Sequence, residues 1–347
     1  MRAYEVGALL GRGGMGAVFR ARRRADGRPI ALKIMSSQAN PERFRREAEA
    51  LARIAHPNVV RVLDFGEEAG GLFLAMEFVE GESLEERIRR QGALPVEDAL
   101  GWTRALAGAL RHVHARGVVH RDIKPENVMI REDGSACLVD FGLALTLDDD
   151  RLTKTGQVLG TLAYAAPELL LGRPEAVGPP ADVFSLGATL YALLTGSAPI
   201  PDGLFGAMLI QAQDVMPPAP RTFCSGVPPD LDRVCMACLA KDPAQRPTLT
   251  ALIESLDACA RSEGRTSWVL VAAGLLVLGL ILAGTALVDS ERLDPSQELA
   301  PALGSQVVER LTVSASGSGA PSAPASPLEE SRRDWPRPND PLAFPDA

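Results

Sequence analysis

The sequence lacks regularly spaced cysteines, an excess of basic residues and an apolar N-terminal segment, on which several classes of protein depend. Its five cysteines are an odd number without regular spacing, which excludes a disulfide framework and fits a reducing compartment. The net charge of −8 lacks the basic excess that nucleic-acid binding requires. Residues 1–6 are short and polar, so we predict no N-terminal signal peptide. We therefore expect a protein that folds in a reducing compartment and has no nucleic-acid partner.

Acidic and amide side chains stand between short apolar runs in residues 120–142. Asp122 and Asn127 precede a predicted hairpin with the turn signal Asp133-Gly134, and Asp140 follows it. We expect the two ends of this segment to converge on one point. Carboxylate and amide oxygens are what a divalent cation and a phosphate-bearing substrate require. The strands predicted here are residues 118–120, 128–130 and 136–139.

The string H-R-D-I-K-P-E-N, followed by D-F-G, resembles the catalytic loop and metal-binding element of eukaryotic-type protein kinases. The resemblance implies that Asp122 accepts the proton of the substrate hydroxyl, and that Asn127 and Asp140 hold two Mg²⁺ ions, with Mn²⁺ as an alternative. It also implies that Lys124 neutralises the transferred phosphoryl group. In this family, a lysine followed by proline marks kinases that act on serine and threonine. The alternative, a hairpin with solvated polar turns, does not account for seven motif residues matching in order.

A glycine-rich loop near the N-terminus matches the same family. The pattern G-x-G-x-x-G also occurs in Rossmann folds, but there a helix follows, whereas strand residues follow here. The resemblance implies that Lys33 binds the ATP phosphates and that Glu47, on the next helix, pairs with Lys33. Met76 and Glu77 resemble the hinge that meets adenine. The residues expected to contact ATP are Leu10, Gly11, Gly13, Gly14, Gly16, Val18, Ala31, Lys33, Met76 and Glu77.

Helix signals surround these motifs. Asn40 followed by proline predicts the start of a helix over residues 41–54. Ser83 and Glu86 form a predicted capping box, and apolar spacing predicts a long helix over residues 95–116. Strands at 62–66 and 72–78 are expected to complete a five-stranded lobe.

The family resemblance assigns regulatory and structural roles beyond the catalytic loop. Thr153 and Thr155 lie where related kinases are commonly phosphorylated, and a phosphate there could pair with Arg121. Unmodified loop threonines are the alternative. The structural residues are Thr161, expected to bond the catalytic Asp and Lys; Glu168 and Arg246, expected to form a buried ion pair; and Asp182, expected to anchor the catalytic-loop backbone.

Residues 268–288 form an uncharged run of 21 residues, about 31 Å long as a helix and sufficient to cross a membrane. Arg261 and Arg265 precede the run and acidic residues follow it, which predicts a cytoplasmic N-terminal part and a C-terminus outside. The remainder is rich in Pro, Ser and Ala and is expected to be disordered.

The predicted fold class is α+β, a bilobal protein-kinase fold. The expected segments are an N-lobe (1–79), a C-lobe (80–260), a juxtamembrane linker (261–267), a transmembrane helix (268–288) and an extracytoplasmic tail (289–347). The expected function is membrane-anchored transfer of the ATP γ-phosphoryl group to Ser or Thr of proteins. Autophosphorylation within a homodimer is part of this hypothesis. A pseudokinase scaffold and a small-molecule phosphotransferase remain the alternatives.

Overall fold

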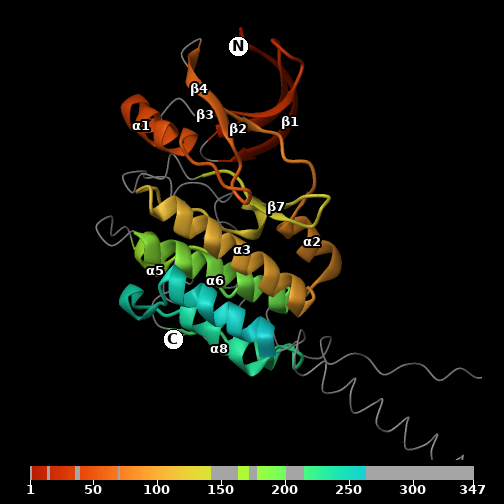
Figure 1. Cartoon of the computed structure of the whole chain (residues 1–347), viewed down its shortest axis with the longest axis vertical. Coiled ribbons are helices and arrows are strands. Elements are labelled where there is room, and N and C mark those ends of the chain that lie inside the picture. The colour runs from red at the N-terminus through yellow and green to blue at the C-terminus, as the bar shows by residue number, and fades with distance from the viewer. Residues whose placement is uncertain are drawn as a thin grey trace, which may run out of the picture. The chain divides into compact units, whose positions relative to one another are not determined.

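The computed structural model describes residues 2–13, 16–35, 40–68, 71–141, 163–171, 178–200 and 215–262. The chain divides into two compact units, Met1–Arg261 and Ser262–Ala347. All of the second unit except its first residue lies outside the described residues, and so do the predicted membrane span and tail. The described part of the chain holds a strand-rich N-terminal lobe and a helical C-terminal lobe, which is the bilobal arrangement expected (Figure 1).

Five antiparallel strands form the N-terminal sheet, in the order β1-β2-β3-β5-β4. Their register places Lys33 of β3 opposite Val18 of β2 and Leu74 of β5. Lys33 therefore belongs to a central strand, where its side chain is only 3% exposed. The strands are β1 (Tyr4–Gly13), β2 (Gly16–Arg23), β3 (Pro29–Met35), β4 (Val62–Glu68) and β5 (Gly71–Glu77).

Helix α1 (Pro41–Ala52) begins where the sequence predicts. The side chain of Asn40 accepts a hydrogen bond from the Arg43 backbone N–H at 3.0 Å, and Pro41 occupies the first helical position, where no N–H is needed. The apolar face of α1 joins the core beneath the sheet through Phe44, Ala48 and Leu51. This helix therefore carries Glu47 on a rigid, capped element.

Loss of the α1 cap should weaken the fold measurably. Replacing Asn40 by Ala removes the acceptor for one N–H of the first turn, and we expect it to cost about 1 kcal/mol of unfolding free energy. Asn40→Asp keeps an acceptor at the same place and should cost much less. Urea unfolding followed by circular dichroism measures both values, and equal losses in the two variants would contradict the cap.

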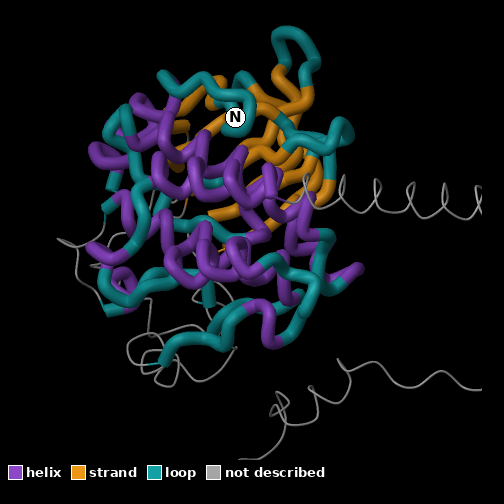
Figure 2. The backbone as a smooth tube through the Cα atoms, turned by 60° about the horizontal axis from the view of Figure 1, so that its bottom comes forward, coloured by secondary structure: helices purple, strands orange, loops and turns teal. Residues whose placement is uncertain are grey.

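Helices build the second lobe around α6, which is buried along almost its whole length. Helices α3 and α8 pack against α6, and Figure 2 draws the helices in purple. A Cβ placed on Gly187 of α6 would lie 2.4 Å from Cβ of Cys238, so glycine permits the close approach of α8. The longer helices are α2 (Leu84–Gln91), α3 (Val96–His114), α6 (Pro179–Thr195) and α8 (Pro229–Cys238), with α5 (Pro167–Leu170) a single turn; residues 249–262 are also helical.

A small sheet has the strand order β6-β7-β8, and its last two strands connect the catalytic loop to Asp140. Its strands β7 (Val128–Ile130) and β8 (Ala136–Leu138) form the predicted hairpin, and β6 (Glu82–Ser83) joins its edge. The hairpin connection is longer than the two residues predicted, because the Arg131 N–H bonds the carbonyl of Ser135 across the turn. Gly134 still supplies the left-handed position, with φ of 81°. The capping box of Ser83 and Glu86 is also present at the start of α2.

The remaining described elements are one-turn 3₁₀ helices. They are η1 (Pro125–Asn127), η4 (Pro220–Thr222) and η5 (Pro243–Gln245). The first of these places Asn127 directly before β7, so the amide side chain is held by an ordered turn.

Candidate active site

The prediction of a strand over residues 118–120 is wrong. These residues form no strand: the Val118 N–H turns back to the carbonyl of Val113 at the end of α3. The backbone N–H groups of His120 and Arg121 instead point at the carboxylate of Asp182, each at 2.8 Å. A side chain from α6 thus takes the donors that a neighbouring strand would otherwise have accepted.

The carboxylate of Asp182 binds backbone N–H groups of the catalytic loop. Its carboxylate is buried, and it also lies 2.7 Å from Nε2 of His114, at the end of α3. These contacts hold Arg121 in the left-handed region, with φ of 66°, which is rare for a residue with a side chain. His114 was not identified from the sequence, because it belongs to no motif and meets Asp182 only through packing of α3 on α6.

The side chains of Asp122 and Asn127 are in direct contact. Nδ2 of Asn127 donates to Oδ2 of Asp122 at 2.9 Å and to the backbone carbonyl of Asp122 at 2.7 Å. Because the amide nitrogen of Asn127 faces Asp122, its carbonyl oxygen faces the other way. The Asp122 carboxylate is therefore fixed in direction, and Asn127 presents an oxygen away from it.

Lys124 lies beside the same carboxylate. Its Nζ is 3.5 Å from Oδ1 of Asp122 and 3.1 Å from Oε2 of Glu126. Burial by itself lowers the pKa of Lys124, but the carboxylates of Asp122, Glu126 and Asp140 outweigh this effect and raise the pKa. Lys124 is thus held as a cation at the point where the resemblance expects a phosphoryl group.

Asp140 emerges from β8 toward the catalytic loop. The Val139 N–H donates to the carbonyl of Asn127 at 2.9 Å, which joins the two halves of the motif. Asp140 adopts a left-handed backbone with φ of 56°, and one oxygen of its carboxylate forms an ion pair with Nζ of Lys33. The ring of Phe141 packs on His120, with centroids 4.4 Å apart. Burial lowers the pKa of His120, so this packed imidazole is held neutral.

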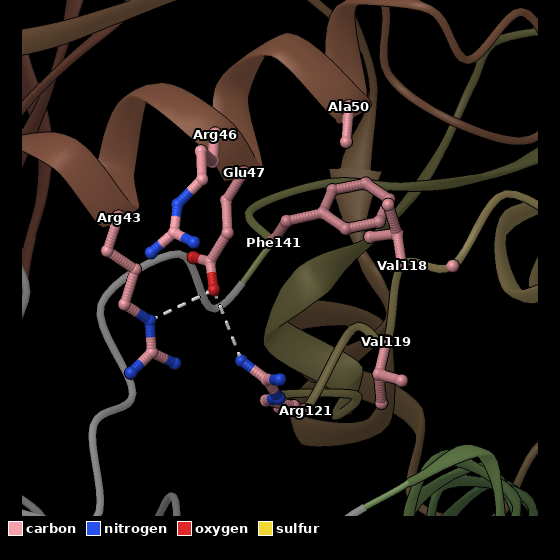
Figure 3. A pocket seen from close by; sticks show the side chains of 9 residues that line it. Arg43, Arg46, Glu47, Ala50, Val118, Val119, Arg121 and Phe141 are labelled. Carbon is pink, nitrogen blue, oxygen red and sulfur yellow. Dashed lines mark hydrogen bonds and ion pairs between the residues drawn. The ribbon is translucent and has the colours of Figure 1, made fainter.

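The predicted ion pair between Lys33 and Glu47 is not formed. Among the described residues, Oε1 of Glu47 lies 3.1 Å from Nε of Arg43 and 3.4 Å from Nη1 of Arg121 (Figure 3). Lys33 instead pairs with Asp140. The guanidinium groups of Arg43, on the same helix, and of Arg121, on the catalytic loop, bind Glu47 in place of Lys33. The sequence signal for it was Arg43, four residues before Glu47 and one turn away on α1.

The residues expected to surround ATP lie along the first three strands and at the end of β5. Gly16 has φ of 146°, and a Cβ there would lie 2.1 Å from the carbonyl oxygen of Ile34, so only glycine fits. Met76 is buried and Glu77 is exposed at the end of β5. Gly14 lies outside the described residues. The others are placed as follows: Leu10, Gly11 and Gly13 on β1, Val18 on β2, and Ala31 on β3.

Glu168 and Arg246 form the expected buried ion pair. Nη1 and Nη2 of Arg246 contact the two carboxylate oxygens of Glu168 at 2.6 and 2.8 Å, and the two side chains are 0% and 5% exposed. Arg246 also donates to the carbonyls of Pro180, Ala240 and Lys241. All five N–H donors of the guanidinium are thereby used. Thr153, Thr155 and Thr161 lie outside the described residues.

The donor set of this site fits a magnesium-bound nucleotide. Mg²⁺ in phosphate-transfer sites is bound by one or two protein oxygens and by the phosphates of the nucleotide. Asp140 offers a carboxylate that is about one-third exposed, and Asn127 offers an amide oxygen turned away from Asp122. Within the described ranges, no three His, Cys, Asp or Glu side chains cluster as a metal site. Asn127 and Asp140 would hold the metal, which would draw charge from the phosphates.

Within the described residues, no helix combines the length and the apolar character needed to cross a membrane. Residues 268–288, predicted to do so, lie outside that part of the chain.

Comparison with known proteins identifies the family. Residues 4–256 match the protein kinase domain. The chain is 38% identical over 248 residues to serine/threonine-protein kinase PknE of Mycobacterium tuberculosis, covering 70% of this chain and 43% of that protein. It is 38% identical over 278 residues to PknJ of Mycobacterium bovis, covering 77% and 47%, and 37% identical over 249 residues to PknD of Mycobacterium tuberculosis, covering 70% and 37%.

The matched segment spans less than half the length of each of these curated relatives. It includes both described lobes and the whole constellation from Lys33 to Arg246. The chain therefore belongs to the protein kinase family.

Proposed function

We propose that this protein is a serine/threonine protein kinase, which transfers the γ-phosphoryl group of ATP to a protein hydroxyl. The observation that supports the proposal is that the catalytic loop and the segment after β8 lie side by side. Asp122 and Lys124 lie together on the catalytic loop, and Asn127 ties this loop to the segment that ends in Asp140. Phosphoryl transfer depends on such positioning and on electrostatic stabilisation.

Each proposed role follows from the surroundings of the side chain. Asp122 would orient the incoming hydroxyl and accept its proton, because its carboxylate is fixed by Asn127 and lies beside Lys124. Lys124 would counter the charge of the phosphoryl group, since neighbouring carboxylates keep it protonated. Lys33 would bind the ATP phosphates once it has left Asp140.

Nucleotide contacts are proposed for the glycine-rich hairpin and for the end of β5. Gly11, Gly13, Gly14 and Gly16 would let backbone N–H groups approach the phosphates, and Gly16 is the position at which no side chain fits. Leu10, Val18 and Ala31 would enclose adenine together with Met76, and backbone groups near Glu77 would bond its edge. These assignments draw support from strand placement and from the family match.

Serine and threonine are the proposed acceptor residues. Lys124 is followed by Pro125, the pair that accompanies Ser/Thr kinases in this family, and the similar mycobacterial proteins carry the name serine/threonine-protein kinase. Mg²⁺ would be the metal, with Mn²⁺ as a substitute of similar oxygen preference.

Membrane anchoring and loop phosphorylation extend the proposal. Residues 268–288 would cross the cytoplasmic membrane once, with a kinase domain (lobes 1–79 and 80–260, linker 261–267) in the cytoplasm and a tail (289–347) outside. Thr153 and Thr155 would be phosphorylated by a second copy of the chain in a transient homodimer. Thr161 would bond Asp122 and Lys124.

The full chain in detergent micelles, incubated with γ-labelled ATP, Mg²⁺ and a generic protein substrate, tests the proposal. We expect label in the substrate and in the chain itself, and acid hydrolysis should release phosphoserine and phosphothreonine. Label confined to phosphotyrosine, or to small molecules, would contradict the assignment. Mapping of the label in the chain should find it at Thr153 or Thr155.

A pseudokinase scaffold is the second candidate, favoured by one observation. Lys33 pairs with Asp140, and Glu47 is bound elsewhere, so the pair that phosphoryl transfer requires is not assembled in this arrangement. A pseudokinase would bind nucleotide and transfer no label. The same incubation therefore separates the two candidates.

A further inference from the structure

Helix α1 and the start of the catalytic loop enclose a cavity of about 460 Å³ (Figure 3). Three guanidinium groups line it, those of Arg43 and Arg46 from α1 and that of Arg121 from the loop. Glu47 reaches into this basic surrounding, where Arg43 and Arg121 both bind the same carboxylate oxygen. The carboxylate is therefore held by positive charge on the side of α1 that faces the cavity.

Glu47 is incompletely satisfied in this position. Its second oxygen, Oε2, is buried and, among the described residues, has no hydrogen-bond partner. A buried carboxylate oxygen without a hydrogen-bond donor raises the free energy of the structure, so this position of Glu47 is unfavourable. The side chains of Arg43 and Glu47 are 31% and 26% exposed, so solvent weakens their attraction. Glu47 can therefore exchange Arg43 for another cationic partner.

The alternative partner of Glu47 is already engaged. Lys33 is bound to Asp140, whereas Glu47 is bound to Arg43 and Arg121. If Glu47 moves to Lys33, the Asp140 oxygen that Lys33 occupies becomes available to a cation. One exchange of partners would thus assemble the Lys33–Glu47 pair and release a proposed metal ligand at once.

We propose that Arg43 is a positioning residue that competes with Lys33 for the carboxylate of Glu47 and so limits the formation of the MgATP site. This inference rests on the proposed kinase function. Arg43 lies four residues before Glu47, so the ion pair forms between neighbouring turns of one helix. Among the described residues, removing Arg43 leaves Arg121 as the single cation bound to Glu47, and the competent arrangement becomes more populated.

The test is the replacement of Arg43 by Gln in the full chain. A partly exposed ion pair of this kind corresponds to a population change of about two- to fivefold. We expect kcat/KM for ATP to rise by about that factor, mainly through a lower KM, and we expect the affinity for MgATP in calorimetry to rise equally. Arg45→Gln removes the same charge from an exposed position of α1 and should change neither value.

The gain should pass through Glu47. In a Glu47→Gln background, Arg43→Gln is expected to leave MgATP affinity unchanged, whereas an effect of overall charge would persist there. Arg43→Lys keeps the charge with a different reach and should give a smaller rise. Unchanged or weaker MgATP binding in folded Arg43→Gln, or an equal gain in the Glu47→Gln background, would overturn the inference. If no variant and no wild-type chain transfers phosphate, the proposed function fails, while MgATP affinity still decides the role of Arg43.

Discussion

Asp122→Asn is expected to lower the rate of phosphoryl transfer by about 10²- to 10⁴-fold, the range measured for loss of a general base. The amide keeps the shape of the carboxylate and can still accept a hydrogen bond from Asn127, so the loop should hold its conformation. What disappears is the negative charge that orients the hydroxyl and takes its proton. Initial rates with labelled ATP and a protein substrate measure this effect.

A matched control is available on the neighbouring hairpin. Asp133 is exposed, and among the described residues its carboxylate accepts hydrogen bonds within its own turn, from the N–H and hydroxyl of Ser135. Asp133→Asn removes the same charge and should leave the transfer rate within about twofold of wild type, as expected for a substitution at an exposed turn. A folded Asp122→Asn chain with undiminished transfer would refute the role of Asp122.

Arg246→Ala is expected to destabilise the helical lobe by about 3 to 5 kcal/mol, as breaking a buried ion pair does. The substitution leaves the Glu168 carboxylate buried without its two donors and removes the contact of Arg246 with the ring of Phe184, whose centroid lies 5.0 Å away. Three backbone carbonyls lose their donor as well. Urea unfolding followed by circular dichroism gives the change in unfolding free energy.

Arg104 provides the comparison for Arg246. It pairs with Asp257 at the surface, where the two side chains are 53% and 31% exposed. Solvent screens such a pair, so Arg104→Ala should cost about 1 kcal/mol or less. Equal losses for Arg104→Ala and Arg246→Ala would show that burial does not set the strength of the Glu168–Arg246 pair.

Local chemistry made much of the fold predictable from the sequence. Asn40 and Pro41 mark the start of α1, and Ser83 with Glu86 marks the start of α2, because caps satisfy backbone N–H groups within a few residues. The pairing of Glu168 with Arg246 was accessible only through the family resemblance, since 78 residues separate them.

Contacts made by tertiary packing could not be predicted from the sequence. Residues 118–120 have the apolar character of a strand, yet Asp182 on α6 binds the backbone donors at the end of this segment. Glu47 lies on α1, the helix that was predicted to carry it, but its partner depends on the competing charges of Arg43, Arg121 and Lys33. Local propensity carries no information about which of several nearby cations a carboxylate binds.

Calorimetric titration of MgATP into the full chain and its variants tests most directly whether Lys33, Asn127 and Asp140 form one nucleotide site. We expect saturable binding that depends on Mg²⁺, and its loss in Asp140→Asn and Lys33→Met, whereas Asp122→Asn should bind as tightly as wild type. MgATP binding that is unchanged in folded Asp140→Asn and Lys33→Met would contradict the site.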